Sequence, residues 1–210
     1  EIYTLSLHDA LPIFGRCGQV VRDFLRFVFE GERGKLFKTA PAAVTNHHAY
    51  AHGLLEHTLT VTESARTMAL VYKNIYPSLN VDVVTAGALL HDLGKIEAYS
   101  MSPMPEMTLP GAVLDHVALG YATFQRLAEE AALEPTIRLH LAHIILSHHG
   151  EKEFGSPVLP ATLEALIVSA ADELDFRLFC WKDAVKDLPP GQDISAYHFA
   201  AQRRFWRVRE

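Results

Sequence analysis

The 210-residue chain has few cysteines and lacks any long hydrophobic run. Its two cysteines, Cys17 and Cys180, are too few and too far apart to suggest a disulfide framework, which favours a reducing compartment. No apolar run approaches the ~18 residues that cross a bilayer, so no membrane partner is expected. Glu1 and Asp9 stand where a secretory signal would carry basic residues. These absences argue against a secreted or membrane-spanning protein and predict a cytoplasmic one.

Histidine is abundant, and charge is unevenly distributed along the chain. Ten of the 12 histidines lie between His47 and His149. Residues 47–176 hold six Lys or Arg against sixteen Asp or Glu, whereas residues 15–46 and 177–210 each carry a net charge of +3. An acidic centre is not the basic footprint of a dedicated nucleic-acid binder. It is either a solvated acidic surface or a cation site whose basic flanks meet an anionic substrate.

Apolar residues recur at helical spacing along most of the chain, and strand-like alternation is largely missing. The segments that this periodicity predicts to be helical are 20–29, 54–72, 113–131, 136–147, 161–179 and 196–206. The fold class is therefore all-α. Three parts are expected: a disordered or foreign leader over residues 1–14, a main domain over 15–187, and a C-terminal helical extension over 188–210.

The motif Leu89–Lys95 carries the clearest chemistry. His91 and Asp92 are adjacent behind an apolar run, so an imidazole nitrogen and a carboxylate oxygen can face the same ion. The two oxygens of the carboxylate also allow it to bridge two ions, which an imidazole cannot do. Lys95 follows His91 by four residues, and Gly94 between them permits close backbone approach.

His57 and Asp172 are the next candidates. His57 lies on the inward half of the helix expected over 54–72, where taken alone a hydrogen-bonded core histidine is favoured over a ligand. Asp172 belongs to a helical stripe whose other members are apolar: Ala165, Val168, Phe176 and Phe179. A carboxylate buried on such a face needs a partner or a metal, because an unpaired buried charge is costly. With His91 and Asp92, these residues form a coherent metal-binding set.

Three further histidines suggest a second ion. His116 falls on the apolar face of its helix, and the pair His148–His149 ends another helix. Either member of the pair could reach a metal, and the sequence does not choose between them. The alternative is that cationic histidines stabilise the end of the helix.

These residues resemble the signature of the HD-domain metal-dependent phosphohydrolases: His57, His91–Asp92, His116, His148 or His149, and Asp172. More narrowly, several motifs are similar to those of YhaM-type 3′–5′ exoribonucleases: Asn46–Tyr50, Gly53–His57, Tyr76–Leu79, His91–Lys95, Ser147–Gly150, Gly155–Pro157 and Asp172–Asp175. The resemblance covers Val20 to Asp187 and implies an HD-domain helical bundle with a metal site between helices. Members usually carry an N-terminal OB-fold domain, for which this chain has no room, so we expect a fragment or a stand-alone branch.

The resemblance also implies a divalent-metal centre with two ions. One ion is expected on His57, His91, Asp92 and Asp172, and the other on His116 and His148 or His149, with Asp92 bridging. Mixed imidazole and carboxylate ligands suit manganese or iron, with zinc, nickel and magnesium as alternatives. Asp92 and Lys95 are the expected catalytic residues, and Lys95 would neutralise charge on the phosphate. His47 and His48 either line the substrate mouth or serve as a helix cap or surface.

The substrate expected from the resemblance is single-stranded RNA or a short oligonucleotide, from which nucleoside 5′-monophosphates are released at the 3′ end. The alternatives are a phosphohydrolase of small nucleotides (nucleoside monophosphates, dNTPs or cyclic nucleotides) and a non-catalytic, metal-stabilised module. Residues 203–207 combine arginines with aromatic residues that could stack on a single strand. A terminal helix that packs its aromatic side chains on the core is the favoured interpretation of that segment. Homo-oligomerisation stays open.

Overall fold

The computed structural model describes residues 13–45, 48–101 and 104–208. Helices dominate, which confirms the all-α prediction. A small antiparallel sheet interrupts them and pairs Ser100 with Glu106. The elements are α2 (Gln19–Phe29), α3 (Gly31–Thr39), α4 (Gly53–Lys73), α5 (Val81–Leu90), α6 (Lys95–Ala98), β1 (Tyr99–Met101), β2 (Pro105–Met107), α7 (Leu109–Glu130), α8 (Pro135–Ser147), η1 (Lys152–Phe154) and α9 (Leu163–Lys186).

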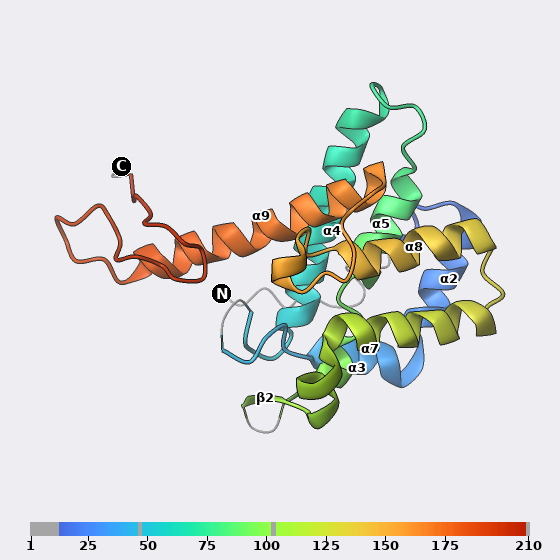
Figure 1. Ribbon diagram of the computed structural model, residues 1–210, viewed down its shortest axis with the longest axis horizontal. Helices are drawn as coiled ribbons and strands as arrows, with labels where there is room; N and C mark the ends of the chain where they lie inside the picture. The colour runs from blue at the N-terminus through green and yellow to red at the C-terminus, as the bar shows by residue number, and fades with distance from the viewer. Residues whose placement is uncertain (1–12, 46–47, 102–103, 209–210) are drawn as a thin grey trace. The chain divides into compact units, whose positions relative to one another are not determined.

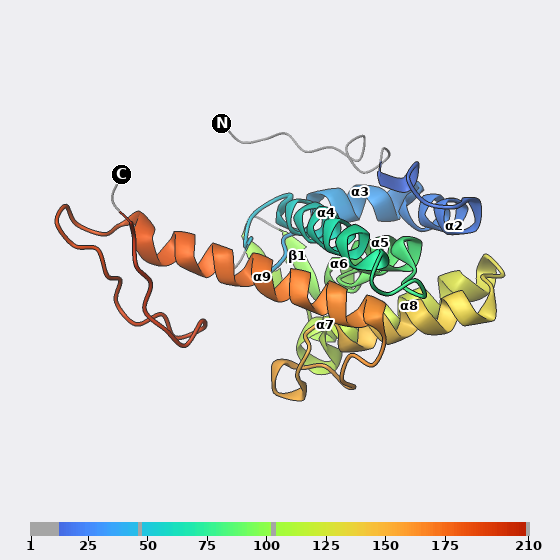
Figure 2. The same cartoon turned by 90° about the horizontal axis from the view of Figure 1, so that it is seen from above.

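The chain divides into two compact units, the first ending at Asp172 and the second beginning at Glu173. In the first unit the helices stack in three layers, with α2 and α3, then α4 and α5, then α7 and α8 (Figure 2). The core between these layers contains fully buried side chains such as Leu25, Leu90 and Phe124. Ile13 and Phe14, two residues of the expected leader, are also part of this core. The rest of that leader, residues 1–12, lies outside the described residues.

Helix α5 is the central element of the first unit and contacts α2, α4 and α8 (Figure 1). Its residues other than Asp82 and Thr85 are apolar or glycine, as expected for a helix that is surrounded by others. The Asn80 side chain caps its first turn by accepting hydrogen bonds from the backbone N–H groups of Asp82 and Val83. The buried Glu164 accepts a hydrogen bond of 2.8 Å from the Asn80 N–H, which ties the start of α9 to the start of α5.

The second unit contains the remainder of α9 and an irregular C-terminal hairpin. The helix expected over 196–206 does not form: Ile194 pairs with Trp206, and His198 pairs with Arg203. Two features explain this error. The segment is rich in aromatic side chains, which favour extended backbone, and Gln202 adopts a positive φ of 52° that breaks a helix.

None of the helices in the described ranges combines the length and the apolar character needed to cross a membrane. Cys17 and Cys180 are both free and buried. Burial raises the pKa of the Cys17 thiol to about 11, so this cysteine is protonated at neutral pH.

Candidate metal centre

The end of α5 carries His91 and Asp92 into the interior, where each is 1% exposed. His91 is the C-cap of α5 and bonds back onto it: its Nδ1 lies 2.7 Å from the Ala88 carbonyl oxygen, to which it donates. A proton on Nδ1 leaves the lone pair on Nε2, which faces Asp92. The helix end therefore fixes both the orientation of the ring and the nitrogen that is free to bind a cation.

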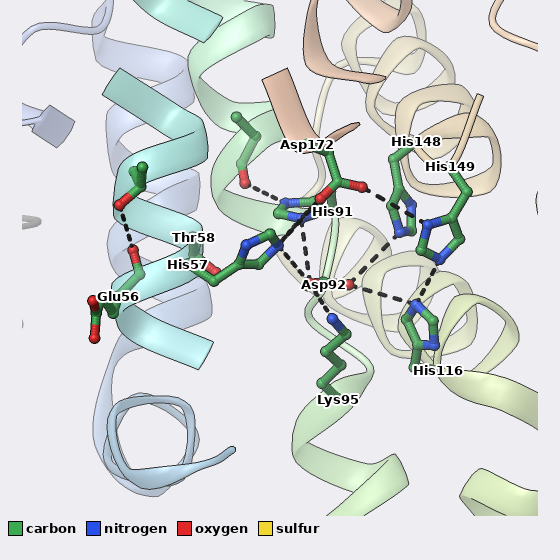
Figure 3. Close-up of polar contacts among 12 residues, drawn as sticks. Glu56, His57, Thr58, His91, Asp92, Lys95, His116, His148, His149 and Asp172 are labelled. Carbon is green, nitrogen blue, oxygen red and sulfur yellow. Dashed lines mark hydrogen bonds and ion pairs between the residues drawn. The ribbon is translucent and has the colours of Figure 1, made fainter. Parts of the chain in front are cut away.

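A first group of ligand atoms surrounds Asp92 Oδ2. His57 Nε2, from α4, lies 3.2 Å from Asp92 Oδ2 and 3.2 Å from Oδ1 of Asp172, which comes from α9. His91 Nε2 lies 3.3 Å from Asp92 Oδ2 and 3.2 Å from His57 Nε2. Figure 3 shows these side chains pointing toward one another. The structure thus brings together the four residues expected to form one site.

A second group faces the other oxygen of Asp92. His116 Nε2 and His148 Nε2 lie 3.5 and 3.6 Å from Asp92 Oδ1. His149 Nε2 lies 3.1 Å from His116 Nε2, and Nδ1 of the same ring lies 3.7 Å from Asp172 Oδ2. The sequence could not choose between the two members of the His148–His149 pair. In the structure both of them point inward (Figure 3).

Several buried polar atoms at this centre lack a hydrogen-bond partner. Among the described residues, none forms a hydrogen bond to Asp92 Oδ1 or His148 Nε2. His148 Nδ1 lies 2.8 Å from the Ile145 carbonyl oxygen and donates to it, which leaves Nε2 as a buried acceptor. Buried acceptors are costly unless something satisfies them. A divalent cation does so, and imidazole with carboxylate is a donor set that such ions bind.

Lys95 provides the compensating charge of the centre. Its Nζ lies 2.7 Å from Asp92 Oδ2, and the residue is 8% exposed. Burial disfavours the charged form of Asp92, but the Lys95 ammonium and His91 outweigh it and hold the pKa of the carboxyl well below its usual range. Burial alone would lower the pKa of Lys95, whereas the neighbouring Asp92 raises it above its usual value. Both groups are therefore charged at neutral pH.

Asp172 is also ionised. Its burial raises the pKa, but the hydrogen bond with His57 and the proximity of His91 lower the pKa by more, so that it lies below the ordinary value. The buried carboxylate of Asp92 and the partly buried carboxylate of Asp172 consequently face several imidazoles and a single ammonium in this part of the structure, an arrangement suited to a cation of higher charge.

Asp115 is a residue of the centre that the sequence analysis missed. It has a φ of 66° inside α7, where it interrupts the helix, and its Oδ1 lies 2.5 Å from His116 Nδ1. The hydrogen bond to His116 holds the pKa of Asp115 below its ordinary value, despite partial burial. A carboxylate on Nδ1 leaves Nε2 of His116 directed at the centre. The only signal in the sequence was that Asp115 precedes His116, and nothing there predicts the kink.

The span Leu54–Arg177 matches the model of the HD domain. The chain belongs to the HD domain family. All seven residues of the two groups lie within the matched span. No solved structure shows a significant match to the chain.

Several curated proteins that are similar to this HD domain carry the same name. The 3′-5′ exoribonuclease YhaM of Bacillus licheniformis is 34% identical over 174 residues, which cover 83% of this chain and 54% of that protein. The 3′-5′ exoribonuclease YhaM of Bacillus subtilis is 34% identical over 171 residues, covering 81% and 53%. A Geobacillus protein of the same name is 32% identical over 195 residues, covering 93% and 59%. The chain thus spans about half the length of these relatives.

His48 lies at the edge of the first group and is 7% exposed. Its ring centre is 5.8 Å from that of His57, and its Nδ1 lies 2.5 Å from the Tyr50 hydroxyl, which donates to Glu56. The expected contact of His48 with substrate stays a prediction, and His47 lies outside the described residues.

Gly94 allows the backbone at the start of α6 to lie close to the backbone of helix α7. A Cβ at this position would lie 2.0 Å from the His116 carbonyl oxygen and 2.3 Å from the Gly120 nitrogen, both of which are backbone atoms. We expect Gly94→Ala to lower the free energy of unfolding by about 3 kcal/mol in urea denaturation. Gly18→Ala is the control, because its Cβ would meet only the Asp82 side chain, at 3.0 Å. Equal stability of the two variants would contradict this packing.

The metal-free HD domain should lose stability as the pH falls below about 6.5, the ordinary pKa of histidine. Burial lowers the pKa of His148 and His149, so both stay neutral in the folded chain under conditions that protonate them in the unfolded one. The unfolded state then binds more protons. Each histidine therefore removes up to about 1.4 kcal/mol of the free energy of unfolding per pH unit. Asp92 and Asp172, whose pKa values are lowered, add to this loss only below about pH 4.

This dependence is measured by urea denaturation in a chelating buffer between pH 7.5 and pH 5. His148→Gln should show a shallower decrease than the wild type, because one of the two protonation sites is gone. A constant free energy of unfolding across this range would show that these histidines are not held neutral by burial.

Proposed function

We propose that this HD domain is a metal-dependent 3′–5′ exoribonuclease that releases nucleoside 5′-monophosphates from single-stranded RNA or short oligonucleotides. The observation that carries the proposal is the position of Asp92, whose two oxygens face two different sets of imidazoles. This is the arrangement required of a carboxylate that bridges two ions. The name of the relatives, 3′-5′ exoribonuclease, supports the choice of substrate.

The two groups of residues divide naturally between two ions. His57, His91, Asp92 and Asp172 would hold one, and His116, His148 and His149 would hold the other and share Asp92. Imidazole and carboxylate together suit manganese or iron. When bound, such a pair of ions supplies an activated water and neutralises charge on the phosphate that is attacked.

Backbone carbonyls and side chains prepare the centre for this chemistry in three ways. The carbonyls of Ala88 and Ile145 hold the rings of His91 and His148 so that each Nε2 keeps its lone pair directed inward. The ionised Asp92 keeps the Lys95 ammonium protonated beside the place where phosphate would bind. Because the centre is buried, the Lys95 charge is screened less than it would be in water and stabilises negative charge that develops on the phosphate.

The proposal is tested with 5′-labelled single-stranded RNA, purified protein and manganese, with products resolved on a gel. We expect a ladder that shortens from the 3′ end with the wild type and not with Asp92→Ala. Asp23→Asn, which changes an exposed carboxylate of α2, is the control and should behave as wild type.

A different pattern of substrates would favour the second candidate. The acidic surplus between residues 47 and 176 favours a small substrate over a long polyanion. Hydrolysis of nucleoside monophosphates, dNTPs or cyclic nucleotides, with RNA left intact, would therefore assign the domain to small-nucleotide hydrolysis. No hydrolysis of either class would contradict both candidates.

A further inference from the structure

We propose that the C-terminal hairpin, residues 194–208, is a binding surface for single-stranded nucleic acid. It lies in the second unit and contributes no residue to the metal centre. The segment contains three arginines and no acidic residue, which gives it a net charge of +3. Tyr197 and Phe199 precede the arginines, and Phe205 and Trp206 stand between Arg204 and Arg207, a combination of residue types typical of surfaces that stack bases and bind phosphates.

Three aromatic side chains of the hairpin are exposed to solvent. Phe199 is 85% exposed, Trp206 61% and Tyr197 46%. Tyr197 and Phe199 form an edge-to-face pair with ring centres 5.3 Å apart. Exposed aromatic groups gathered in this way mark interaction sites, because burying them against a partner is favourable. Every nucleobase offers a flat π face to such rings, whatever its sequence.

The backbone of the hairpin is held in place by its own hydrogen bonds. The N–H of Ser195 donates to the Phe205 carbonyl at 2.9 Å, and the N–H of Phe205 donates to the Ser195 hydroxyl at 2.9 Å. The N–H of His198 donates to the Arg203 carbonyl at 2.8 Å. The aromatic side chains are therefore presented on an ordered backbone, which reduces the entropy lost when a strand binds.

The arginines of the hairpin have different roles. The Arg207 guanidinium donates to the backbone carbonyls of several residues and closes the base of the hairpin: Val185, Leu188, Pro189 and Gln192. Within the described part of the chain, no hydrogen bond or ion pair engages the exposed guanidinium of Arg204. Arg207 is thus structural, and Arg204 is available for a phosphate.

Charge decides between the candidate occupants of this surface. A second copy of the chain would bring two segments of net charge +3 together, which is unfavourable. A phosphate backbone is complementary to that charge, and its bases are complementary to the exposed rings. The inference rests on the proposed function only in taking the bound strand to be the substrate of the metal centre.

The test measures binding in a chelating buffer, where hydrolysis does not occur, by fluorescence anisotropy of a labelled oligouridylate. Phe199→Ala and Trp206→Ala should each raise Kd about tenfold. Arg204→Gln should reduce the slope of log Kd against log salt by about 0.7, the value for one lost phosphate contact with a single strand. Tyr72→Ala and Arg126→Gln change an exposed aromatic and an exposed arginine of the first unit and should leave Kd unchanged.

Three results would overturn the inference. They are unchanged binding by the three hairpin variants, equal binding of an RNA duplex, and a change of oligomeric state in Phe199→Ala, which would identify an interface between copies. The experiments can contradict the proposed binding surface and the proposed exoribonuclease activity independently of each other. A wild type that binds the strand in the chelating buffer but degrades no RNA with manganese retains the surface and contradicts the exoribonuclease.

Discussion

We expect that replacing Asp92 with asparagine will lower the rate of RNA hydrolysis at saturating manganese by at least about 10³-fold, equivalent to a loss of about 4 kcal/mol of transition-state stabilisation. The reason is that Asp92 faces both groups of residues: its Oδ2 faces His57 and His91, and its Oδ1 faces His116 and His148. The neutral amide keeps the volume of the side chain but offers only one oxygen. It cannot bridge two ions.

The measurement is the initial rate for wild type and Asp92→Asn over a range of manganese concentrations. Loss of the buried charge also leaves the Lys95 ammonium without its partner, which destabilises the fold. The thermal midpoint of each protein is therefore measured alongside, and rates are compared below the lower midpoint. A folded Asp92→Asn protein with wild-type activity would exclude Asp92 as the bridging ligand.

We expect that substitution of Lys95 by methionine will reduce kcat about 10²-fold and leave KM for RNA within a small factor of the wild-type value. Methionine fills the space of the aliphatic stem without its charge. The Asp92 carboxylate keeps the pKa of Lys95 raised, so the wild-type ammonium is charged throughout the neutral range. The loss should therefore be constant across neutral pH.

The manganese content of Lys95→Met distinguishes stabilisation of the phosphate by Lys95 from a structural role of this residue in the metal centre. Manganese bound by Lys95→Met should equal that of wild type, because no ligand atom is removed. Arginine at the same position should not restore kcat, since its planar fork is larger and the site is buried. If Lys95→Met kept wild-type kcat, or lost its manganese, Lys95 would not be the group that stabilises the phosphate.

Helices α2, α4, α7 and α8 of the first unit and the seven residues of the two groups could be predicted from the sequence, because both depend on local pattern. Helices α3 and α5 were not among the predicted segments. Asp172 stood out as the polar member of an apolar stripe, and the structure places it 3.2 Å from His57. The position of His57, taken alone, favoured a hydrogen-bonded core histidine. Only together with the His91–Asp92 pair did it indicate a metal site. The resemblance to HD-domain proteins agrees with the matched span.

The residues that orient the ligands could not be predicted, because they act through backbone geometry. The carbonyls of Ala88 and Ile145 carry no signal of residue type, and Asp115 reaches His116 through a positive φ. The prediction of a helix in the C-terminal segment was wrong for a related reason. Its apolar spacing suits a helix, but the four carbonyls held by Arg207 and the pairing of Ile194 with Trp206 are contacts between distant residues.

We propose above all that Asp92 would bridge two metal ions in one centre. It is tested most directly by titrating the metal-free wild-type protein with manganese and following the electron paramagnetic resonance spectrum. We expect two ions per chain with the signal of an exchange-coupled pair, and loss of the coupling in Asp92→Asn. A single ion at saturation, or two ions without coupling, would contradict it.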